Sequence, residues 1–292
     1  MPDRLLAMNA GSLPARYWAH DLDPFLVKFT ETIGIRYYGL SYMLGFLAGF
    51  LLLHLASKRG RSPLGVAQNA DYLFVLVIGV LLGGRLGYFL LYETGSVVRD
   101  PLMLMRVWEG GMASHGGFVG VLLAMLWFAR SRRVSFWRLA DLTCMITPPG
   151  LFFGRIANFI NGELWGRVTD VPWAVIFPDS APTGTPLERI QPRHPSQLYE
   201  AGLEGLLLFA FVALRYWRGR TASIAPGRIV GEFLVVYSVL RIVAEQFREP
   251  DAALILGMSR GIFYSILMGV AGVAIAVLAQ RRAVSSKSSK GA

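Results

Sequence analysis

Cysteine and charge are both scarce in this chain of 292 residues. The single cysteine, Cys144, excludes an intrachain disulfide, and its position in an apolar run predicts a small packing residue. Charged residues make up 16% of the chain and hydrophobic residues 54%. This composition is far more apolar than that of a soluble globular domain. We therefore expect helices whose apolar surfaces face lipid.

Motifs for several kinds of chemistry are missing as well. The sequence has no cysteine pair, no HExxH motif and no carboxylate-rich motif with metal-ligand spacing. It has neither a P-loop nor a dinucleotide-binding fingerprint. We therefore predict no metal and no cofactor. The net charge of +10 is not taken to indicate nucleic acid, because the basic residues cluster in short loops between apolar runs.

Seven apolar stretches are each about as long as a bilayer crossing, which takes about 20 residues. They predict spans at 36–56, 70–92, 113–130, 139–158, 198–217, 228–247 and 262–280. Residues 1–35 lack the apolar region of a signal peptide and are expected on the outer face. The predicted organisation is transmembrane helices 1–4 in 36–158, a head segment in 159–197, helices 5–7 in 198–280 and a basic tail in 281–292.

The head segment is expected to be a small mixed domain on the outer face, between the fourth and fifth spans. Its six prolines exclude one long helix, and a short strand is predicted within Val171–Phe177. The fold class is therefore predicted to be an all-α integral membrane protein with seven transmembrane helices and this head.

Positive charge gathers on one side of the predicted spans. Four loops or tails hold basic residues and almost no acid: Lys58, Arg59 and Arg61; Arg130, Arg132, Arg133 and Arg138; Arg215, Arg218, Arg220 and Arg228; Arg281, Arg282, Lys287 and Lys290. Cytoplasmic loops carry such an excess. We therefore expect a multi-pass protein with its N-terminus outside and its C-terminus in the cytoplasm.

Several polar side chains fall inside these spans or at their ends: Tyr38, Arg85, His115, Arg155, Asn158, Asn161, Glu163, Arg241 and Glu245. A charge in the bilayer is costly, by a few kcal/mol or more, so such a residue usually lines a functional cavity. With the predicted orientation, all of them lie in the outer half of the membrane. Tyr237, Arg241 and Glu245 also follow one another at four-residue spacing and share one side of a helix. The pattern predicts one cavity open to the outer face.

Each of these features also has a purely structural interpretation. Arg241 and Glu245 could form an ion pair that only stabilises the fold, and Arg85 could extend to lipid phosphates. His115 could be a packed core histidine, and the asparagines could bond between helices. The glycines around Arg85 and His115 either allow close helix packing or leave room for a ligand. The joint placement of the polar groups on one side favours the cavity.

Arginines in an apolar cavity indicate an anionic ligand, because guanidinium groups match phosphate oxygens in a bidentate way. In a cavity that opens to the outer leaflet, a phospholipid headgroup is the expected anion. With no metal predicted, the chemistry would depend on positioning, on arginine electrostatics and on a proton acceptor. His115 is the candidate acceptor.

Six segments of the chain resemble bacterial prolipoprotein diacylglyceryl transferases. GRIANFINGELWGR at 154–167 carries the strongest likeness. The other segments, in the family's order, are IRYYGLSY at 35–42, GGRLGY at 83–88, RVWEGGMASHGG at 106–117, RHPSQLYE at 193–200 and YSVLRIVAEQFREPD at 237–251. Together they cover the chain from about residue 25 to 280.

The resemblance implies a reaction on the outer face of the bacterial inner membrane. Phosphatidylglycerol would give its diacylglyceryl group to the lipobox cysteine of a prolipoprotein signal peptide. A thioether forms and glycerol phosphate leaves, as the first step of lipoprotein maturation. The implied partners are therefore phosphatidylglycerol, prolipoproteins and membrane lipid. The resemblance also implies that five positions are important for activity, because the matching positions of the family are regarded so: His115, Arg155, Asn158, Gly166 and Arg241.

Three residues are predicted to be catalytic. Arg155 and Arg241 would clamp the phosphate and stabilise the leaving group, and His115 would accept the thiol proton directly or through water. Alternatively, the field of the arginines alone supplies thiolate, and His115 mainly positions the substrate. The predicted substrate-binding residues are Tyr38, Arg85, Asn158, Asn161, Glu163, Gly166, Tyr237 and Glu245.

The supporting roles follow from charge and position. We expect Glu245 to hold Arg241, Glu163 to orient Arg155 or Asn158, and the two tyrosines to bind the headgroup or orient the arginines. Arg85 is expected to bind a lipid phosphate.

Two other functions fit parts of the pattern. A phosphatidyl-group transferase with another acceptor could use the same arginines, but the nucleotide-dependent members of that class need an aspartate-rich metal motif. A transporter or flippase would favour paired repeats and a site near the midplane. The sequence offers neither feature, so the transferase is favoured.

Overall fold

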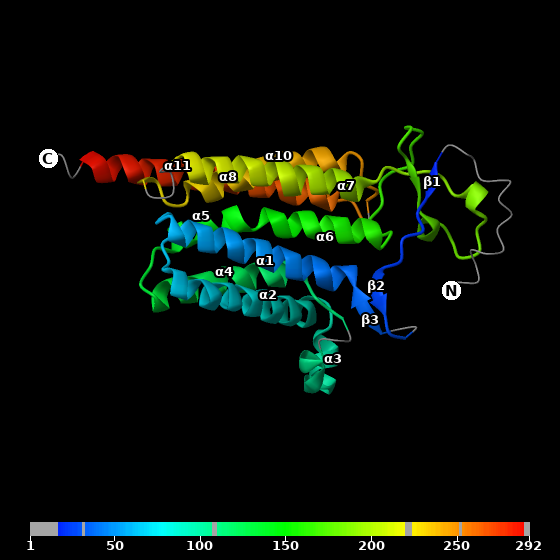
Figure 1. Cartoon of the computed structure of the whole chain (residues 1–292), viewed down its shortest axis with the longest axis horizontal. Coiled ribbons are helices and arrows are strands. Elements are labelled where there is room, and N and C mark those ends of the chain that lie inside the picture. The colour runs from blue at the N-terminus through cyan, green and yellow to red at the C-terminus, as the bar shows by residue number, and fades with distance from the viewer. Residues whose placement is uncertain (1–16, 31–32, 107–109, 220–223, 251–252, 289–292) are drawn as a thin grey trace. The chain divides into compact units, whose positions relative to one another are not determined.

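Helices make up most of the computed structural model, which describes residues 17–30, 33–106, 110–219, 224–250 and 253–288 (Figure 1). The strands are β1 (Trp18–Ala19), β2 (Phe25–Lys28), β3 (Gly34–Arg36) and β4 (Val175–Ile176). The longer helices are α1 (Tyr37–Lys58), α2 (Asn69–Leu91), α4 (Ser114–Ser131), α5 (Phe136–Ile146), α6 (Pro148–Ile160), α8 (Leu208–Arg218), α10 (Arg228–Glu245) and α11 (Arg260–Ser288). The short helical segments are η2 (Val66–Gln68), α3 (Thr94–Arg99), η3 (Pro101–Met105), η5 (Pro178–Ser180), η6 (Leu187–Arg189), α7 (Ser196–Glu200) and the π-helix η7 (Ala201–Leu207).

Four helical segments are long and apolar enough to cross a membrane: Tyr37–Lys58, Val66–Leu91, Ser196–Arg218 and Arg260–Ser285. They coincide with the first, second, fifth and seventh predicted spans. Many of their large apolar side chains are exposed, such as Leu90 and Val270 at 70% and 67%. Because water would disfavour so much apolar surface, these helices fit a lipid environment. The third and sixth predicted spans coincide with α4 and α10, each of 18 residues.

The fourth predicted span, 139–158, is wrong as a single helix. Helix α5 ends at Ile146, and α6 begins at Pro148. Pro148 and Pro149 have no backbone N–H to donate to the preceding turn, and their rings crowd it. In the first turn of a helix, backbone N–H groups have no partner within the helix, so their absence from the two prolines costs nothing there. The prolines therefore suit the start of α6.

The chain forms two compact units, and each is described by itself. Unit 1 comprises Met1–Gly45, Thr147–Leu214 and Gly231–Ile275. Unit 2 comprises Phe46–Ile146, Arg215–Val230 and Ala276–Ala292. Among the described residues, Tyr38 and all predicted site residues from Arg155 onwards belong to unit 1, whereas Arg85 and His115 belong to unit 2.

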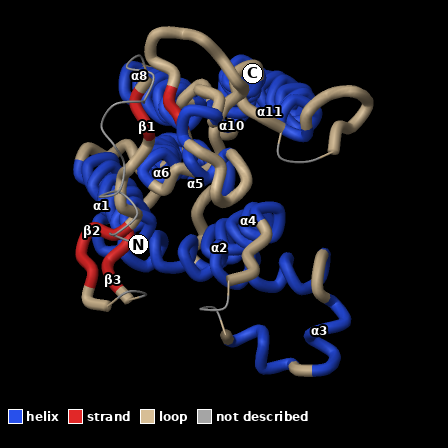
Figure 2. Tube along the Cα trace, turned by 90° about the vertical axis from the view of Figure 1, so that its right-hand side faces the viewer, coloured by secondary structure: helices blue, strands red, loops and turns tan. Residues whose placement is uncertain are grey.

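In unit 2, helices α2 and α4 lie side by side and meet through glycines (Figures 1 and 2). A Cβ atom on Gly83 would lie 2.3 Å from the carbonyl oxygen of Gly116, and one on Gly120 would lie 2.0 Å from that of Gly79. No larger residue fits at these positions without moving a helix. Of the two interpretations of the glycines, close helix packing therefore accounts for these four.

Helix α5 is also anchored within unit 2. The fully buried carboxylate of Asp141 accepts hydrogen bonds from the backbone N–H groups of Gly227 and Val230, at 2.8 and 2.9 Å. These N–H groups lie at the start of α10. The first N–H groups of a helix have no acceptor within the helix, and the helix dipole favours a negative charge beside them. Asp141 thus ties α5 to the first turn of α10.

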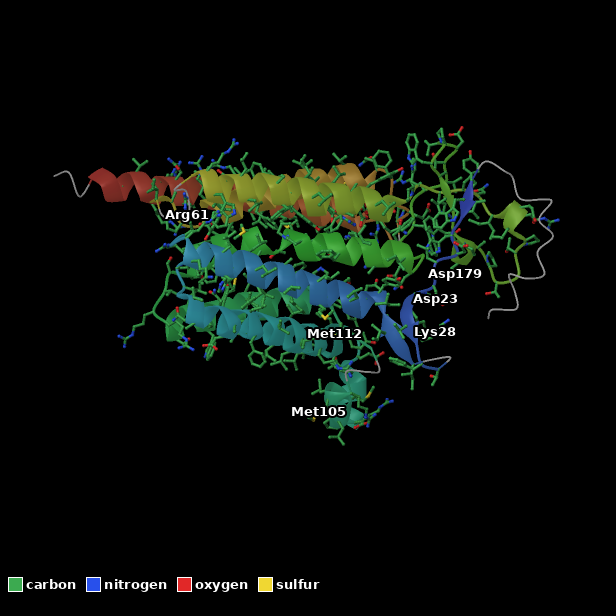
Figure 3. The ribbon with its side chains drawn as sticks, viewed as in Figure 1. Asp23, Lys28, Arg61, Met105, Met112 and Asp179 are labelled. Carbon is green, nitrogen blue, oxygen red and sulfur yellow. The ribbon has the colours of Figure 1, made fainter. Side chains whose placement is uncertain are left out.

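In unit 1, the segment between α6 and α7 contains β4 and the 3-10 helices η5 and η6. The strand predicted within Val171–Phe177 is present but short, and β4 pairs in parallel with β1, with Trp18 opposite Val175. Strands β2 and β3 form a separate antiparallel hairpin. Asp23 and Lys28, which Figure 3 labels, form a 2.9 Å ion pair beside it. The hydrogen bond from Lys28 lowers the pKa of Asp23, and the backbone N–H of Phe25 contributes.

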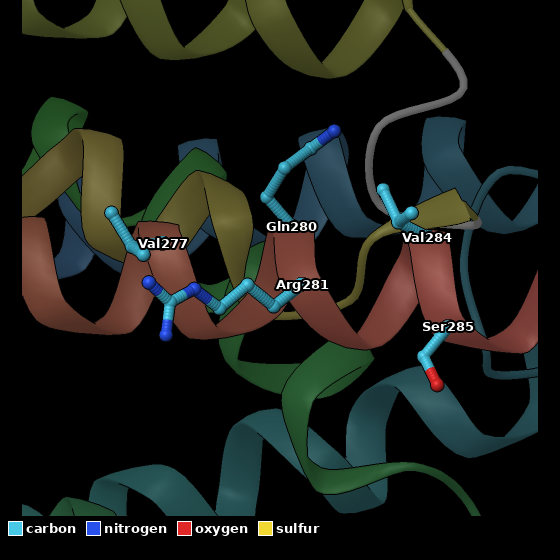
Figure 4. Close-up of a pocket in the computed structure, with 5 residues that line it drawn as sticks. All are labelled: Val277, Gln280, Arg281, Val284 and Ser285. Carbon is cyan, nitrogen blue, oxygen red and sulfur yellow. The ribbon is translucent and has the colours of Figure 1, made fainter.

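The C-terminal helix is longer than expected. The basic tail was predicted from residue 281, but α11 continues to Ser288. An open depression of about 440 Å³ lies on it, lined by Val277, Gln280, Arg281, Val284 and Ser285 (Figure 4). It contains none of the predicted site residues. Arg220 and Lys290, which contributed to the predicted charge asymmetry, lie outside the described residues.

Candidate functional site

Three arginines and three glutamates form one connected set of ion pairs in unit 1. We call it the Arg–Glu network, and its members are Arg155, Arg241, Arg248, Glu200, Glu204 and Glu245. Helix α6 supplies the first arginine and α10 supplies Arg241 and Glu245. Glu200 ends α7, and Glu204 lies in η7. Segments far apart in the sequence therefore build one site.

Glu200 and Glu204 lie at the centre of the network and are 1% and 0% exposed. Arg155 Nε lies 2.8 Å from Glu200 Oε2, and its Nη2 lies 3.4 Å from Glu204 Oε2. Arg241 Nη1 lies 3.2 Å from Glu200 Oε1 and 3.1 Å from Glu204 Oε1. The two arginines thus share both carboxylates, which brings their guanidinium groups together.

The contacts at the edge of the network hold Arg241 in place. Its Nη2 lies 2.7 Å from Glu245 Oε2, so the contact expected from the four-residue spacing is present. Arg248 Nη1 lies 3.1 Å from Glu200 Oε1. Removing one partner from such a buried pair typically costs about 3–5 kcal/mol, because a charge is left without compensation. The network therefore fixes the guanidinium groups before any ligand arrives.

The π-helix η7 sets the positions of the two central glutamates. Glu200 and Glu204 are four residues apart, on either side of the point where α7 passes into η7. This segment packs closely on α6, since a Cβ atom on Gly205 would lie 2.6 Å from the Cβ of Phe152. A π-helical turn inside an α-helix is often found at functional sites. Here the π-helical turn contains Glu204, a central member of the network.

A second polar group in unit 1 joins the start of α1 to the end of α6. Tyr38 Oη donates a hydrogen bond to Glu163 Oε1 and accepts one from Asn158 Nδ2. Asn158 Nδ2 also lies 2.7 Å from Glu163 Oε1. Of the two roles expected for Glu163, the contact is with Asn158, whereas Arg155 pairs with Glu200 and Glu204.

The other predicted site residues of unit 1 make different contacts. Asn161 caps the C-terminus of α6, and its side-chain oxygen is buried without a hydrogen-bond partner among the described residues. Tyr237 lies one turn before Arg241 on α10 and stacks on Phe233, with ring centroids 6.1 Å apart. Their roles in substrate binding stay predictions.

Gly166 lies where two backbone segments approach each other closely. A Cβ atom there would lie 2.5 Å from the carbonyl oxygen of Phe247 and 2.6 Å from that of His194. Its N–H donates to the His194 carbonyl at 2.9 Å. Partial burial lowers the pKa of the His194 imidazole, whose Nδ1 lies 3.1 Å from Tyr199 Oη. These contacts show why residue 166 must be glycine, and its expected part in substrate binding stays a prediction.

Arg85 does not have the contacts of a lipid-binding arginine. Its side chain is 5% exposed, and its guanidinium donates to five backbone carbonyls: those of Met103, Leu104, Arg106, Gly110 and Gly111. A guanidinium has five N–H groups, so its capacity is filled. Figure 3 labels Met105, which ends η3 between two of these carbonyls, and Met112, which directly follows Gly111. These contacts favour a structural role for Arg85, and the expectation that it binds a lipid phosphate stays a prediction.

His115 is the second residue of α4 and is exposed. The residue before this helix, Ala113, donates its N–H to the carbonyl of Gly84 on α2 at 2.9 Å, which fixes where α4 begins. Because His115 and Arg85 belong to unit 2 and the Arg–Glu network to unit 1, the single cavity that joins them stays a prediction.

Three members of the network, Glu200, Glu204 and Arg248, were not among the predicted site residues. Glu204 carries the signal that identified Arg241, since it is an ionisable residue inside a predicted span. Glu200 stands four residues earlier and so shares its side of the helix. Arg248 lies just beyond the sixth predicted span, and its position in the sequence gives no such signal.

The arrangement suits recognition of an anion next to an apolar phase. Donor groups remain on the arginines, because among the described residues no partner contacts Nη1 of Arg155. A small apolar groove of about 60 Å³ lies nearby between α1 and α6, lined by residues such as Ser41, Phe153 and Ala157. Among the described residues, no cluster of three or more His, Cys, Asp or Glu side chains could hold a metal ion.

Comparisons with known proteins agree over most of the chain. Residues 24–278 match the family model described as prolipoprotein diacylglyceryl transferase. A phosphatidylglycerol–prolipoprotein diacylglyceryl transferase of Rhodospirillum rubrum is 46% identical over 265 residues, which are 89% of this chain and 93% of that protein. Proteins of the same name from Bradyrhizobium diazoefficiens and Vibrio atlanticus are 43% and 42% identical, over 85% and 90% of this chain and 88% and 92% of their own. The chain therefore belongs to the prolipoprotein diacylglyceryl transferase family.

Proposed function

We propose that this protein transfers the diacylglyceryl group of phosphatidylglycerol to the lipobox cysteine thiol in the signal peptide of a prolipoprotein. The reaction forms a thioether, releases glycerol phosphate and begins lipoprotein maturation. The observation that carries the proposal is the Arg–Glu network, in which Arg155 and Arg241 share two buried glutamates. Family membership supports the transferase class and its substrates.

The guanidinium groups of Arg155 and Arg241 are proposed to bind the phosphate. Their side chains are 20% and 13% exposed, so they are mostly desolvated but still reachable by a ligand. Charge-assisted hydrogen bonds from guanidinium to phosphate are strong and can be bidentate. The apolar groove of about 60 Å³ beside Ser41 suits part of an acyl chain.

The bond changes define what the site must stabilise. The thiolate sulfur attacks the glycerol carbon that carries the phosphate, a C–S bond forms, and the C–O bond breaks. The electron pair of that bond leaves with the phosphate oxygen, where the arginines stabilise the new charge. The thiol proton goes to His115, directly or through water. Alternatively, the arginine field lowers the thiol pKa enough to supply thiolate, and His115 positions the substrate.

The membrane arrangement is also part of the proposal. We place the protein in the inner membrane with seven crossings. The third, fourth and sixth crossings are α4, the α5–α6 pair and α10. The N-terminus and the segment 159–197 are proposed to lie outside and the C-terminus in the cytoplasm, in accord with the basic loops. Phosphatidylglycerol of the outer leaflet and the exported prolipoprotein then meet on the same side.

Product analysis tests the reaction. Purified protein is incubated with phosphatidylglycerol and a lipobox peptide, and the peptide mass and the released glycerol phosphate are measured. We expect a mass gain of one diacylglyceryl unit on cysteine with an equal amount of glycerol phosphate. An unmodified peptide under conditions where the lipid is shown to bind would contradict the proposal. A peptide with serine in place of cysteine is the matched control.

A further inference from the structure

The Arg–Glu network is balanced in charge before any ligand arrives. Its three arginines face three glutamates, and both central carboxylates are almost fully buried. A site built only to attract phosphate would leave its arginines uncompensated, because Coulomb attraction grows with the net charge of the site. The glutamates therefore limit how strongly the network attracts an anion.

The two central carboxylates must lie close to any phosphate that both arginines bind. Glu204 contacts Arg155 through Oε2 and Arg241 through Oε1, and Glu200 contacts the same two arginines. A phosphate held by both guanidinium groups is thus separated from these carboxylates by about the width of one guanidinium. In a desolvated site, repulsion over that distance is only weakly screened.

Substrate and product differ in charge. A phosphodiester such as phosphatidylglycerol carries one negative charge on its phosphate. Glycerol phosphate is a phosphomonoester and carries about 1.5 to 2 negative charges at pH 7, because its second pKa is near 6. In the proposed reaction a thiolate and a singly charged diester give a neutral thioether and a doubly charged monoester. The charge on the phosphate therefore rises inside the site as the C–O bond breaks.

We propose that Glu200 and Glu204 limit the affinity of this site for the doubly charged glycerol phosphate product, so that the product can leave after it has formed. This inference rests on the proposed function, since it takes the network as the phosphate site. The arginines bind the diester and stabilise the leaving group. The glutamates then weaken the binding of the finished product.

The wild-type protein gives the first test. The affinities of glycerol phosphate and of glycerophosphoglycerol, a soluble phosphodiester, are measured by calorimetry at pH 8 and pH 5.5. We expect the two compounds to bind within about fivefold of each other at pH 8, the effect of one unit charge at about 4 Å in water, because the glutamates offset the attraction of the arginines for the second charge. The difference should shrink at pH 5.5, where the monoester is mostly singly charged. Binding of the monoester that is much more than about fivefold tighter at pH 8 would overturn the inference.

A substitution gives the second test. Glu204→Gln keeps the shape of the side chain and removes its charge, so glycerol phosphate should bind at least about fivefold more tightly at pH 8. Diacylglyceryl transfer should then be inhibited by lower concentrations of this product. Glu249→Gln is the matched control, because Glu249 pairs with Arg193 at 3.2 Å, is half exposed and lies outside the network. Unchanged or weaker binding in a folded Glu204→Gln protein would overturn the inference, and if that variant does not fold, the wild-type comparison decides.

The two levels of the proposal fail differently. If the protein transfers the diacylglyceryl group but binds the monoester much more than about fivefold more tightly than the diester, the role of the glutamates is wrong and the reaction stands. If neither compound binds and no transfer occurs, the network is not the phosphate site, and both proposals fall.

Discussion

Arg85 and Arg241 have the same side chain and similar positions in apolar sequence, yet their contacts differ. Arg85 gives its donors to backbone carbonyls, whereas Arg241 pairs with carboxylates and keeps 13% of its side chain exposed. An arginine whose donors are all used inside the protein organises the backbone. One that is held by carboxylates and partly exposed is available to an anion. The partners therefore favour a structural role for Arg85 and ligand binding for Arg241, a difference that residue type alone does not indicate.

Arg85→Lys should destabilise unit 2. Lysine has three donors, so at least two of the five carbonyls lose their partner, and each buried unsatisfied group costs about 1–3 kcal/mol. We expect a loss of at least about 2 kcal/mol, measured as a lower midpoint of thermal unfolding in detergent. Arg132→Lys is the control, because its pair with Asp71 is exposed and such pairs contribute about 1 kcal/mol or less. Equal effects of the two substitutions would contradict the role of Arg85.

His115→Gln separates the two roles proposed for His115. If His115 accepts the thiol proton, the variant should lose about 100-fold or more of its turnover at neutral pH. Activity should then recover only as the pH approaches the range of a free thiol, near 8.5. The measurement is the pH–rate profile of both proteins. Turnover of the variant close to that of the wild type at neutral pH would assign proton removal to the arginine field.

The spacing of residues in the sequence predicts an ion pair correctly where both side chains of the pair lie on one helix. The pairing of Arg241 with Glu245 follows from their four-residue separation. The carbonyl partners of Arg85 lie 18 to 26 residues away along the chain and are backbone atoms, so residue types do not reveal them. The shared glutamates of Arg155 and Arg241 likewise depend on how α6, η7 and α10 pack together.

At the scale of elements, glycine and proline decide where helices approach and where they end. Six of the seven predicted spans coincide with continuous helical segments, because long apolar runs specify helices strongly. The fourth predicted span is divided into two helices, because hydropathy does not register the missing N–H groups of Pro148 and Pro149. The π-helix η7 could not be predicted either, since its apolar pattern does not distinguish i→i+5 from i→i+4 hydrogen bonds.

Two glycines of η7 allow a matched test of that packing. A Cβ atom on Gly205 would lie 2.6 Å from the Cβ of Phe152, whereas one on Gly202 would meet nothing within 4 Å. Gly205→Ala should therefore push η7 away from α6, displace Glu204 and lower both activity and thermal stability. Gly202→Ala should leave both close to wild type. Similar behaviour of the two variants would show that the close contact does not position the network.

At the scale of the whole molecule, the distribution of basic residues predicts which side each loop faces. The chain has one native cysteine, so cysteine labelling can map this directly after Cys144→Ala. Thr183→Cys, between η5 and η6, should react with a membrane-impermeant maleimide in cells whose outer membrane has been permeabilised. Ser131→Cys, at the end of α4, should react only after the inner membrane is opened. The reverse pattern would invert the proposed orientation.

The proposed reaction itself depends on the pairing of Arg155 and Arg241 as a phosphate clamp. Turnover of phosphatidylglycerol by Arg241→Lys tests this most directly, because lysine keeps the charge but loses the planar fork that contacts three glutamates. Folding and insertion are checked by thermal unfolding and by the labelling described above. We predict a folded protein that has lost most of its transferase activity. Turnover like that of the wild type would contradict the clamp and the assignment of the Arg–Glu network as the phosphate site.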